Sequence, residues 1–232
     1  MNSILVVSIV ALALGIAAYN YWRQKKVREV AEGLGLAFLP QAEILAELAG
    51  SELTNNSGHS RKCVNCFGGD ADGISFKVFE YQFWTGYGRN QVKHSQTICK
   101  VDLGNSEIAD FTLHPKSMIG NLFKPVVNKM SVDPAFDGSF NVSSVEPLKA
   151  RPVFTDSVKR LIQLNRWTVE SCRGRLMIYR DRKTIGHRQL KQFLTDSLEL
   201  MTLLEEASRT PASAVFPQVS TGSIPVTGIT TH

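Results

Sequence analysis

A glycine-rich turn flanked by basic side chains is the stretch whose residue types come closest to a ligand site. Gly86 and Gly88 allow backbone amides to converge on an anion, and Arg89, Lys93 and His94 would add positive charge. The stretch lacks the Lys-Ser/Thr ending of a phosphate-binding loop and the third glycine of a dinucleotide loop, and it joins two predicted strands. A hairpin turn with positive φ angles is therefore the favoured interpretation, and a ligand- or nucleotide-binding enzyme domain is the alternative.

Two other pairs of residues suggest chemistry without completing a site. His94 and Ser95 are adjacent in a predicted strand, so their side chains point to opposite faces and do not pair as base and nucleophile. Asp70 and Asp72 resemble the opening of a calcium loop, but the later ligands and the closing glutamate are absent. We predict no catalytic residue, no cofactor and no metal, and we lean against an enzyme.

The four cysteines are too few and too scattered to form a disulfide framework, and a cytoplasmic domain would keep them reduced. Cys63 and Cys66 form a lone C-x-x-C motif with His59 nearby, but no second ligand pair follows at zinc-site spacing. The motif leads into a turn and does not open a helix, as a thioredoxin-like motif would. Buried strand cysteines are the favoured interpretation, and a metal site and a redox site remain alternatives.

Positive charge is concentrated late in the chain. Such a surface could face nucleic acid or an anionic lipid leaflet, and a solvated basic face is the plainer interpretation. We take Arg180, Arg182 and Lys183 as candidate contacts for anionic lipid, and nucleic-acid binding through residues 173–191 as the less favoured alternative. The cations of the stretch are Arg166, Arg173, Arg175, Arg180, Arg182, Lys183, Arg188 and Lys191, against Glu170 and Asp181.

The beginning of the chain predicts where these candidate sites are held. Residues 4–21 are about 18 uncharged, mostly apolar residues, enough for a helix of roughly 27 Å that just spans a bilayer. Tyr19, Tyr21 and Trp22 follow, as expected of side chains at a lipid interface. We therefore expect residues 4–22 to contact the lipid bilayer as a single transmembrane anchor.

The cations directly after this segment predict its orientation. They lie beyond the apolar run, whereas a cleaved signal peptide carries its positive charge before it. The N-terminus is expected outside and the bulk of the chain in the cytoplasm; a cleaved signal and a buried core helix are the alternatives. Ala11 and Gly15 could pack two anchors into a homo-oligomer. The flanking cations, candidate lipid contacts as well, are Arg23, Lys25, Lys26 and Arg28.

The remaining chain has the composition of one folded domain. It is 43% hydrophobic and 20% charged, with a formal net charge of +5. We divide the chain into a transmembrane anchor at 1–22, a juxtamembrane helical arm at 23–50, a cytoplasmic α+β domain at 51–206 and a disordered Ser/Thr/Pro tail at 207–232.

Alternating apolar residues predict antiparallel strands. Residues 61–67, 74–83 and 92–103 form a predicted three-strand meander, with residues 68–73 as a turn. The middle run is apolar on both faces, so either both faces are covered or a bulge changes the phase near Val78. Further strands are expected at 110–114 and 140–145, and a hairpin at 167–180.

Helical periodicity predicts the elements that cover this sheet. A short helix is expected over 42–48, a helix capped by Thr155 through residue 164, and a long amphipathic helix from about His187 to Glu206. The fold class is therefore α+β: an N-terminal transmembrane helix, then one domain with a meander and a late hairpin covered by two or more helices.

Four stretches of the chain resemble a family of uncharacterised bacterial membrane-anchored proteins. They are GLGLAF, FEYQFWTGYGRNQVKHSQT, DFTLHP and LMIYRD, in that order, within residues 33–206. The chain departs from the family pattern at Glu80, Phe83 and Tyr87. The resemblance implies a bacterial origin and a cytosolic α+β domain on a single anchor, and it carries no assigned activity.

The anchor, combined with no complete catalytic constellation, predicts a non-catalytic interaction or scaffold module at the bacterial inner membrane. Its expected partners are the bilayer, anionic lipid head groups and a protein partner that the sequence does not identify.

Overall fold

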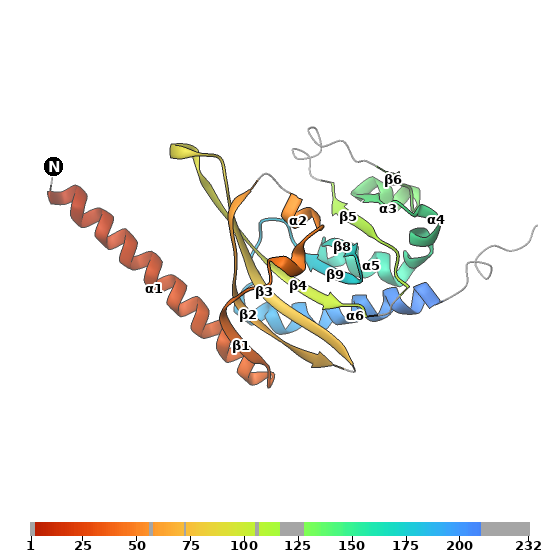
Figure 1. The fold of residues 1–232 in the computed structure, drawn as a ribbon, viewed down its shortest axis with the longest axis horizontal. Coiled ribbons are helices and arrows are strands. Elements are labelled where there is room, and N and C mark those ends of the chain that lie inside the picture. The colour runs from red at the N-terminus through yellow and green to blue at the C-terminus, as the bar shows by residue number, and fades with distance from the viewer. Residues whose placement is uncertain (1–2, 56–57, 72, 105–106, 117–127, 210–232) are drawn as a thin grey trace, which may run out of the picture.

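The computed structural model describes residues 3–55, 58–71, 73–104, 107–116 and 128–209, with only the backbone at residues 3–6, 9 and 55. A long first helix projects from a body built around one sheet (Figure 1). Of the disordered tail predicted at 207–232, residues 207–209 belong to the last helix, and the residues from 210 onward lie outside the described part of the chain.

The helices lie mainly in the second half of the chain, apart from the first. The α-helices are α1 (Ser3–Gly33), α2 (Glu52–Asn55), α3 (Pro134–Ser139), α4 (Pro147–Ala150), α5 (Asp156–Asn165) and α6 (Leu190–Arg209). Short 3-10 turns are η1 (Ala46–Leu48), η2 (Gly88–Asn90), η4 (Arg151–Val153) and η5 (His187–Gln189).

Within the described part of the chain, nine strands form one sheet in the order β1-β2-β3-β4-β9-β8-β5-β7-β6. Every neighbouring pair is antiparallel. The strands are β1 (Ala37–Ala42), β2 (His59–Ala71), β3 (Ile74–Thr85), β4 (Val92–Asp102), β5 (Phe111–Pro115), β6 (Lys129–Met130), β7 (Phe140–Ser143), β8 (Thr168–Cys172) and β9 (Arg175–Tyr179).

Both faces of the sheet are covered, which explains the unusual pattern of β3. Phe76 and Val78 belong to the larger core, together with residues of α1, α5 and α6. Phe79 and Tyr81 point the other way, into a smaller core that includes Leu48. The pairing of β3 with β4 runs without a register shift, so the first of the two predicted explanations is correct. The irregularities lie in β2 instead.

The smaller core is covered by a segment of residues 44–55, which we call the cap. It contains η1 and α2, and its Ile44, Leu48 and Leu53 are buried against the sheet. Polar contacts hold it in place as well: Lys77 and Lys100 donate to Glu47 at 2.8 and 2.6 Å. Although burial raises the pKa of Glu47, these hydrogen bonds hold it below its ordinary value.

The predicted α+β class, the meander and the late hairpin are confirmed. The third strand ends one residue earlier than predicted, and the hairpin turns at Arg173 and Gly174, both with positive φ. Thr155 caps α5 by accepting from the amide of Val158, and the long C-terminal helix is α6 with η5 before it. These elements have strong local signals, namely alternation, a turn glycine and a capping hydroxyl.

Three predicted elements differ from the structure. The helical arm ends at Gly33, and residues 37–42 form strand β1, so the sheet begins before residue 51. Pro40 lies in this edge strand, where a missing amide hydrogen leaves no ladder bond unmade. Residues 68–71, predicted as a turn, continue β2. In place of the helix predicted at 42–48 the chain forms only the turn η1, followed by α2.

Candidate functional site

The candidate functional site lies where α1 enters the body, and it is formed by residues that are far apart in the sequence. Its centre is Arg23, whose Nε donates to Oε1 of Glu80 on β3 at 2.7 Å. Nη2 of Arg23 donates to the carbonyl oxygen of Ile185 at 2.8 Å. The Arg23 and Glu80 side chains are only 10% and 7% exposed. Arg23, predicted as a lipid contact, is therefore a buried structural residue, because its charge is satisfied inside the protein.

The loop of residues 180–188, between β9 and α6, lies against this junction. The rings of Trp22 and His187 meet edge to face at 5.3 Å. The loop also follows the part of β4 that extends beyond β9: the amide of Thr97 donates to Lys183 O at 3.1 Å, and its Oγ1 accepts from the amide of Ile185 at 2.8 Å. Two segments that are far apart in sequence are thus brought together.

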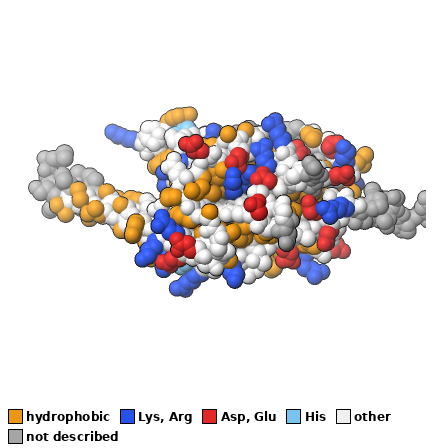
Figure 2. Space-filling model, turned by 60° about the horizontal axis from the view of Figure 1, so that its bottom comes forward, with side chains coloured by type: hydrophobic (Ala, Val, Ile, Leu, Met, Phe, Trp, Pro, Cys, Tyr) orange, Lys and Arg blue, Asp and Glu red, His pale blue; other side chains and the backbone are white. Residues whose placement is uncertain are grey.

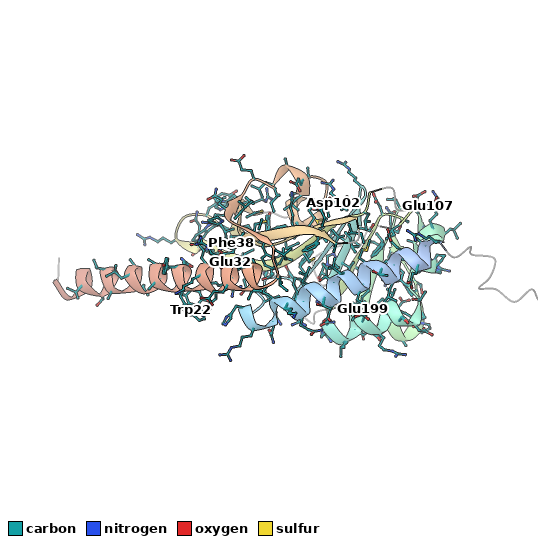
Figure 3. All side chains as sticks on the ribbon, turned by 90° about the horizontal axis from the view of Figure 1, so that it is seen from below. Trp22, Glu32, Phe38, Asp102, Glu107 and Glu199 are labelled. Atoms are coloured by element: carbon teal, nitrogen blue, oxygen red, sulfur yellow. The ribbon has the colours of Figure 1, made fainter. Side chains whose placement is uncertain are left out.

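We call the cations of this region the exit surface. Lys25, Arg182, Lys183 and Arg188 are exposed, and Lys26 is half-buried beside Glu29 at 2.7 Å. Figure 2 shows Lys and Arg side chains gathered where the projecting helix joins the body. The labelled Trp22 marks the same place in Figure 3. The structure therefore brings together candidates that the sequence analysis drew from two separate stretches.

Other predicted cations serve the fold. Arg180 donates to the Asn165 carbonyl at 2.8 Å, at the C-terminus of α5, so it is not an open lipid contact as predicted. Arg175 donates to the carbonyl oxygens of Glu47 and Ala49 in the cap. Arg28 remains exposed with its guanidinium 5.1 Å from the centre of the Phe38 ring. The basic stretch of residues 166–191 is therefore partly structural.

The glycine-rich turn is the tip of the β3–β4 hairpin, as predicted. Gly86 and Gly88 have φ angles of +76° and +60°, and a Cβ on Gly86 would lie 2.4 Å from the carbonyl oxygen of Asn90. His94 is turned back onto the hairpin, where its Nε2 lies 2.8 Å from Thr85 Oγ1. Burial, followed by the nearby charge of Arg182, lowers the pKa of His94. Arg89 and Lys93 are exposed.

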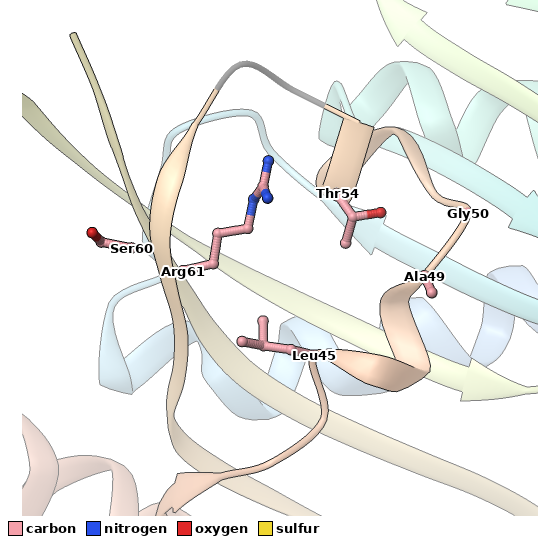
Figure 4. A pocket seen from close by; sticks show the side chains of 6 residues that line it. All are labelled: Leu45, Ala49, Gly50, Thr54, Ser60 and Arg61. Carbon is pink, nitrogen blue, oxygen red and sulfur yellow. The ribbon is translucent and has the colours of Figure 1, made fainter. Parts of the chain in front are cut away.

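A pocket of about 450 Å³ lies between β2 and the cap (Figure 4). The Arg61 side chain points into this space, with Leu45 and Thr54 on the opposite side. Arg61 is not among the residues predicted from the sequence, because no local pattern predicts that a segment covers β2 at this point. The wall is mostly apolar, so the pocket offers one cation and no pair of groups suited to acid–base chemistry.

Titratable groups meet beneath the other end of the cap. Nε2 of His114 lies 2.8 Å from Oε2 of Glu52, whose amide donates to Oε2 of Glu170 at 2.8 Å. Glu170 is 1% exposed and accepts a hydrogen bond from the Tyr179 hydroxyl. Burial raises the pKa of Glu170 above its ordinary value of 4.5. These contacts join α2 to the strands, so these side chains help to attach the cap to the sheet.

The cysteines lie in the sheet with free thiols. Burial raises the pKa of the Cys63 thiol to about 12 and that of the Cys66 thiol to about 11. Burial also raises the pKa of Cys99 to about 12. Thiols with such pKa values are poor nucleophiles at neutral pH. In the described residues no group of three or more His, Cys, Asp or Glu side chains is placed to hold a metal ion.

Comparisons with known proteins leave the chain without a family assignment. No family model matches it, and no curated protein sequence is significantly similar to it. Among solved structures it is similar to the mycobacterial trehalose monomycolate transport factor A, TtfA, with 9% sequence identity and a TM-score of 0.49. That match covers 80% of this chain and 94% of the other, and at this level it supports no conclusion about function.

None of the helices in the described part of the chain combines the length and the apolar character needed to cross a bilayer.

We predict that the Arg23–Glu80 pair is necessary for stability mainly because each partner neutralises the other. Arg23→Met should lower the free energy of unfolding by about 3–5 kcal/mol, since it leaves a buried carboxylate without its cation. The double variant Arg23→Met, Glu80→Gln should recover much of that loss. Urea denaturation followed by tryptophan fluorescence measures both.

Lys26→Met is the matched control for this pair, because its partner Glu29 is 45% exposed and the loss should stay within about 1 kcal/mol. Equal losses in the single and the double variant would contradict the interpretation.

We predict that Glu170 makes the stability of the protein fall as the pH rises above about 4.5. Its pKa is higher in the folded than in the unfolded chain, so the folded state binds more protons in the interval between the two values. The favourable contribution is complete below the unfolded pKa and is lost as the pH rises through the folded one.

Glu170→Gln should remove this dependence. The unfolding free energy of the variant, minus that of the unmodified chain at the same pH, should increase from pH 4 to pH 8. A difference that stays constant over this range would show that Glu170 is not the titrating group.

Proposed function

We propose that the protein is a single-pass membrane-anchored scaffold whose domain binds close to the lipid surface at the exit of α1. The observation that carries the proposal is the character of the projecting half of α1, residues 7–22. Its large apolar side chains are exposed on the free helix, for example Val7 at 67%, Leu12 at 66% and Leu14 at 65%. A helix apolar around its circumference requires a cover on all sides, and lipid provides one.

The chemistry at the end of this segment supports the same proposal. Tyr19, Tyr21 and Trp22 are exposed and lie just before α1 enters the body. Aromatic side chains of this kind favour the interface between lipid tails and water. Lys25 and Lys26 follow directly, which favours a cytoplasmic domain with the N-terminus outside.

The exit surface then faces the lipid head groups. Arg182, Lys183 and Arg188 come from a loop held against α1 by the contacts of Arg23 and Trp22. Each cation near an anionic leaflet contributes about 1 kcal/mol to binding. The proposal is of a non-catalytic role in which the domain is presented to other proteins at the inner membrane of a bacterium.

We predict that cysteines introduced on the two sides of the membrane will differ in their labelling in cells. A cysteine introduced as Ser3→Cys should react with a membrane-impermeant maleimide in intact cells, because the N-terminus is outside. Gly138→Cys, where an added Cβ meets no other atom within 4 Å, should react only after the inner membrane is opened. Labelling of Gly138→Cys in cells whose outer membrane alone is permeable would overturn the proposed orientation.

The exit surface is predicted to enrich anionic lipid around the anchor. The full chain, extracted with its surrounding bilayer from membranes of mixed phosphatidylglycerol and phosphatidylethanolamine, should carry more phosphatidylglycerol than the bulk membrane. The double variant Arg182→Glu, Lys183→Glu should lose this enrichment, as measured by lipid mass spectrometry.

A control with the same charge change uses the far part of the molecule. Lys129 on β6 and Arg160 on α5 are exposed, and Lys129→Glu, Arg160→Glu should leave the enrichment unchanged. Equal loss in both double variants would mean that net charge, and not the exit surface, selects the lipid.

A further inference from the structure

The β3–β4 hairpin extends beyond the strands on either side of it. The pairing of β3 and β4 continues as far as Thr85 and Val92. On one side the pairing of β3 with β2 reaches Trp84, opposite His59, and on the other the pairing of β4 with β9 stops at Ile98. The tip, residues 85–92, therefore lies past both neighbouring strands, and it is shown in yellow in Figure 1.

The surface of this tip combines exposed apolar groups with positive charge. Tyr87 is 79% exposed and Val92 is 53% exposed. Arg89 and Lys93 are exposed beside them. The sequence from Tyr81 to Val101 contains no Asp or Glu, so no acidic side chain of this part of the hairpin offsets these cations. Tyrosine with flanking cations suits the head-group layer of an anionic bilayer.

Specific contacts hold the tip in one conformation. The ring of His59 stacks on Tyr87 with a centroid distance of 5.2 Å, and its Nε2 lies 3.0 Å from the carbonyl oxygen of Gly86. Thr85 and His94 are joined across the base of the turn. A tip ordered in this way loses little conformational entropy on binding.

The tip and the projecting half of α1 lie at the same end of the molecule, as Figures 1 and 3 both show. The loop of residues 180–188 lies between α1 and β4, since its Ile185 carbonyl accepts from Arg23 and the amide of its Arg182 donates to Gln96 Oε1 at 2.8 Å. If a bilayer surrounds the projecting helix, the tip therefore lies on the side of the body that faces this bilayer.

We propose that the β3–β4 tip is a second membrane contact, in which Tyr87 and Val92 enter the interfacial layer and Arg89 and Lys93 bind lipid phosphates. The contact rests on the proposed anchor for its placement. With α1, it provides two separated attachments, so the domain is held at a fixed tilt to the membrane and does not swing about one helix.

Quenching by spin-labelled lipids in nanodiscs of the full chain tests the contact. A fluorophore is attached through a single introduced cysteine, in a chain that also carries Cys172→Ser because Cys172 is the one native thiol that is not fully buried. Three positions are compared: Asn90→Cys at the tip, Leu12→Cys on the projecting helix, and Gly138→Cys at the far end as the unquenched control. The discs contain phosphatidylcholine with or without phosphatidylglycerol.

We expect spin labels near the head group to quench the Asn90 probe, and mid-chain labels to quench the Leu12 probe. Arg89→Glu, Lys93→Glu should reduce the apparent occupancy of the tip contact in anionic discs by roughly fivefold for each cation removed, with the Leu12 signal unchanged. Tyr87→Ser is a second variant that removes the ring and leaves both cations. Circular dichroism checks that each variant retains the fold.

The two proposals fail separately in this experiment. If the Leu12 probe is quenched and the Asn90 probe is not, the hairpin contact is overturned and the anchor stands. Quenching at Asn90 alone would overturn the anchor and keep the contact, and quenching at neither would overturn both. An Asn90 probe that becomes shielded only when another protein is added would also overturn the lipid contact, because the tip would then be a protein-binding element.

Discussion

The buried ion pair between Arg23 and Glu80 is the interaction on which the geometry of the molecule depends. It joins the first helix to the third strand across 57 positions of sequence, and the same guanidinium holds the Ile185 carbonyl. Either charge alone in that position would be costly, so helix, strand and loop are stable only together. Val27 and Ala31, fully packed one and two turns later, continue the attachment into the larger core. The axis of α1 is thereby set relative to the sheet.

A second constraint acts on the opposite face of the same strand. Because β3 is apolar on both sides, it requires a cover on each, and the cap provides the second one. The cap is a short, irregular segment, and its backbone carbonyls need donors from elsewhere. Arg175 supplies them at Glu47 and Ala49, and the Tyr81 hydroxyl donates to Leu53 O at 3.1 Å. Cations that look like a binding surface in the sequence are used in this way to complete the fold.

Much of the fold could be predicted from the sequence because its signals are local. The meander, the β8–β9 hairpin and the capped helix α5 are defined by alternation, turn glycines and Thr155 within short windows. Strand β1 could not be predicted, because AFLPQA has no alternation, and its proline is tolerated because β1 is the outermost strand of the sheet that the described residues form. The burial of Arg23 could not be predicted either. In the sequence Arg23 belongs to a basic run with Lys25 and Lys26, and only the fold places the carboxylate of Glu80 beside it.

Most basic residues of the candidate site could be identified from the sequence, but their proximity in the fold could not be predicted. The sequence shows two separate basic stretches, one after the apolar segment and one near residues 180–188. They lie together only because β4 extends past β9, which leaves a strand edge for the loop to follow. That same extension produces the free hairpin tip. A longer β3–β4 pair therefore creates both features at once, and a rigid helix entry gives them a common direction. A flexible linker after the projecting part of α1 would leave either surface without a defined orientation, whereas a helix locked by a buried charge pair holds both surfaces in one orientation relative to its own axis.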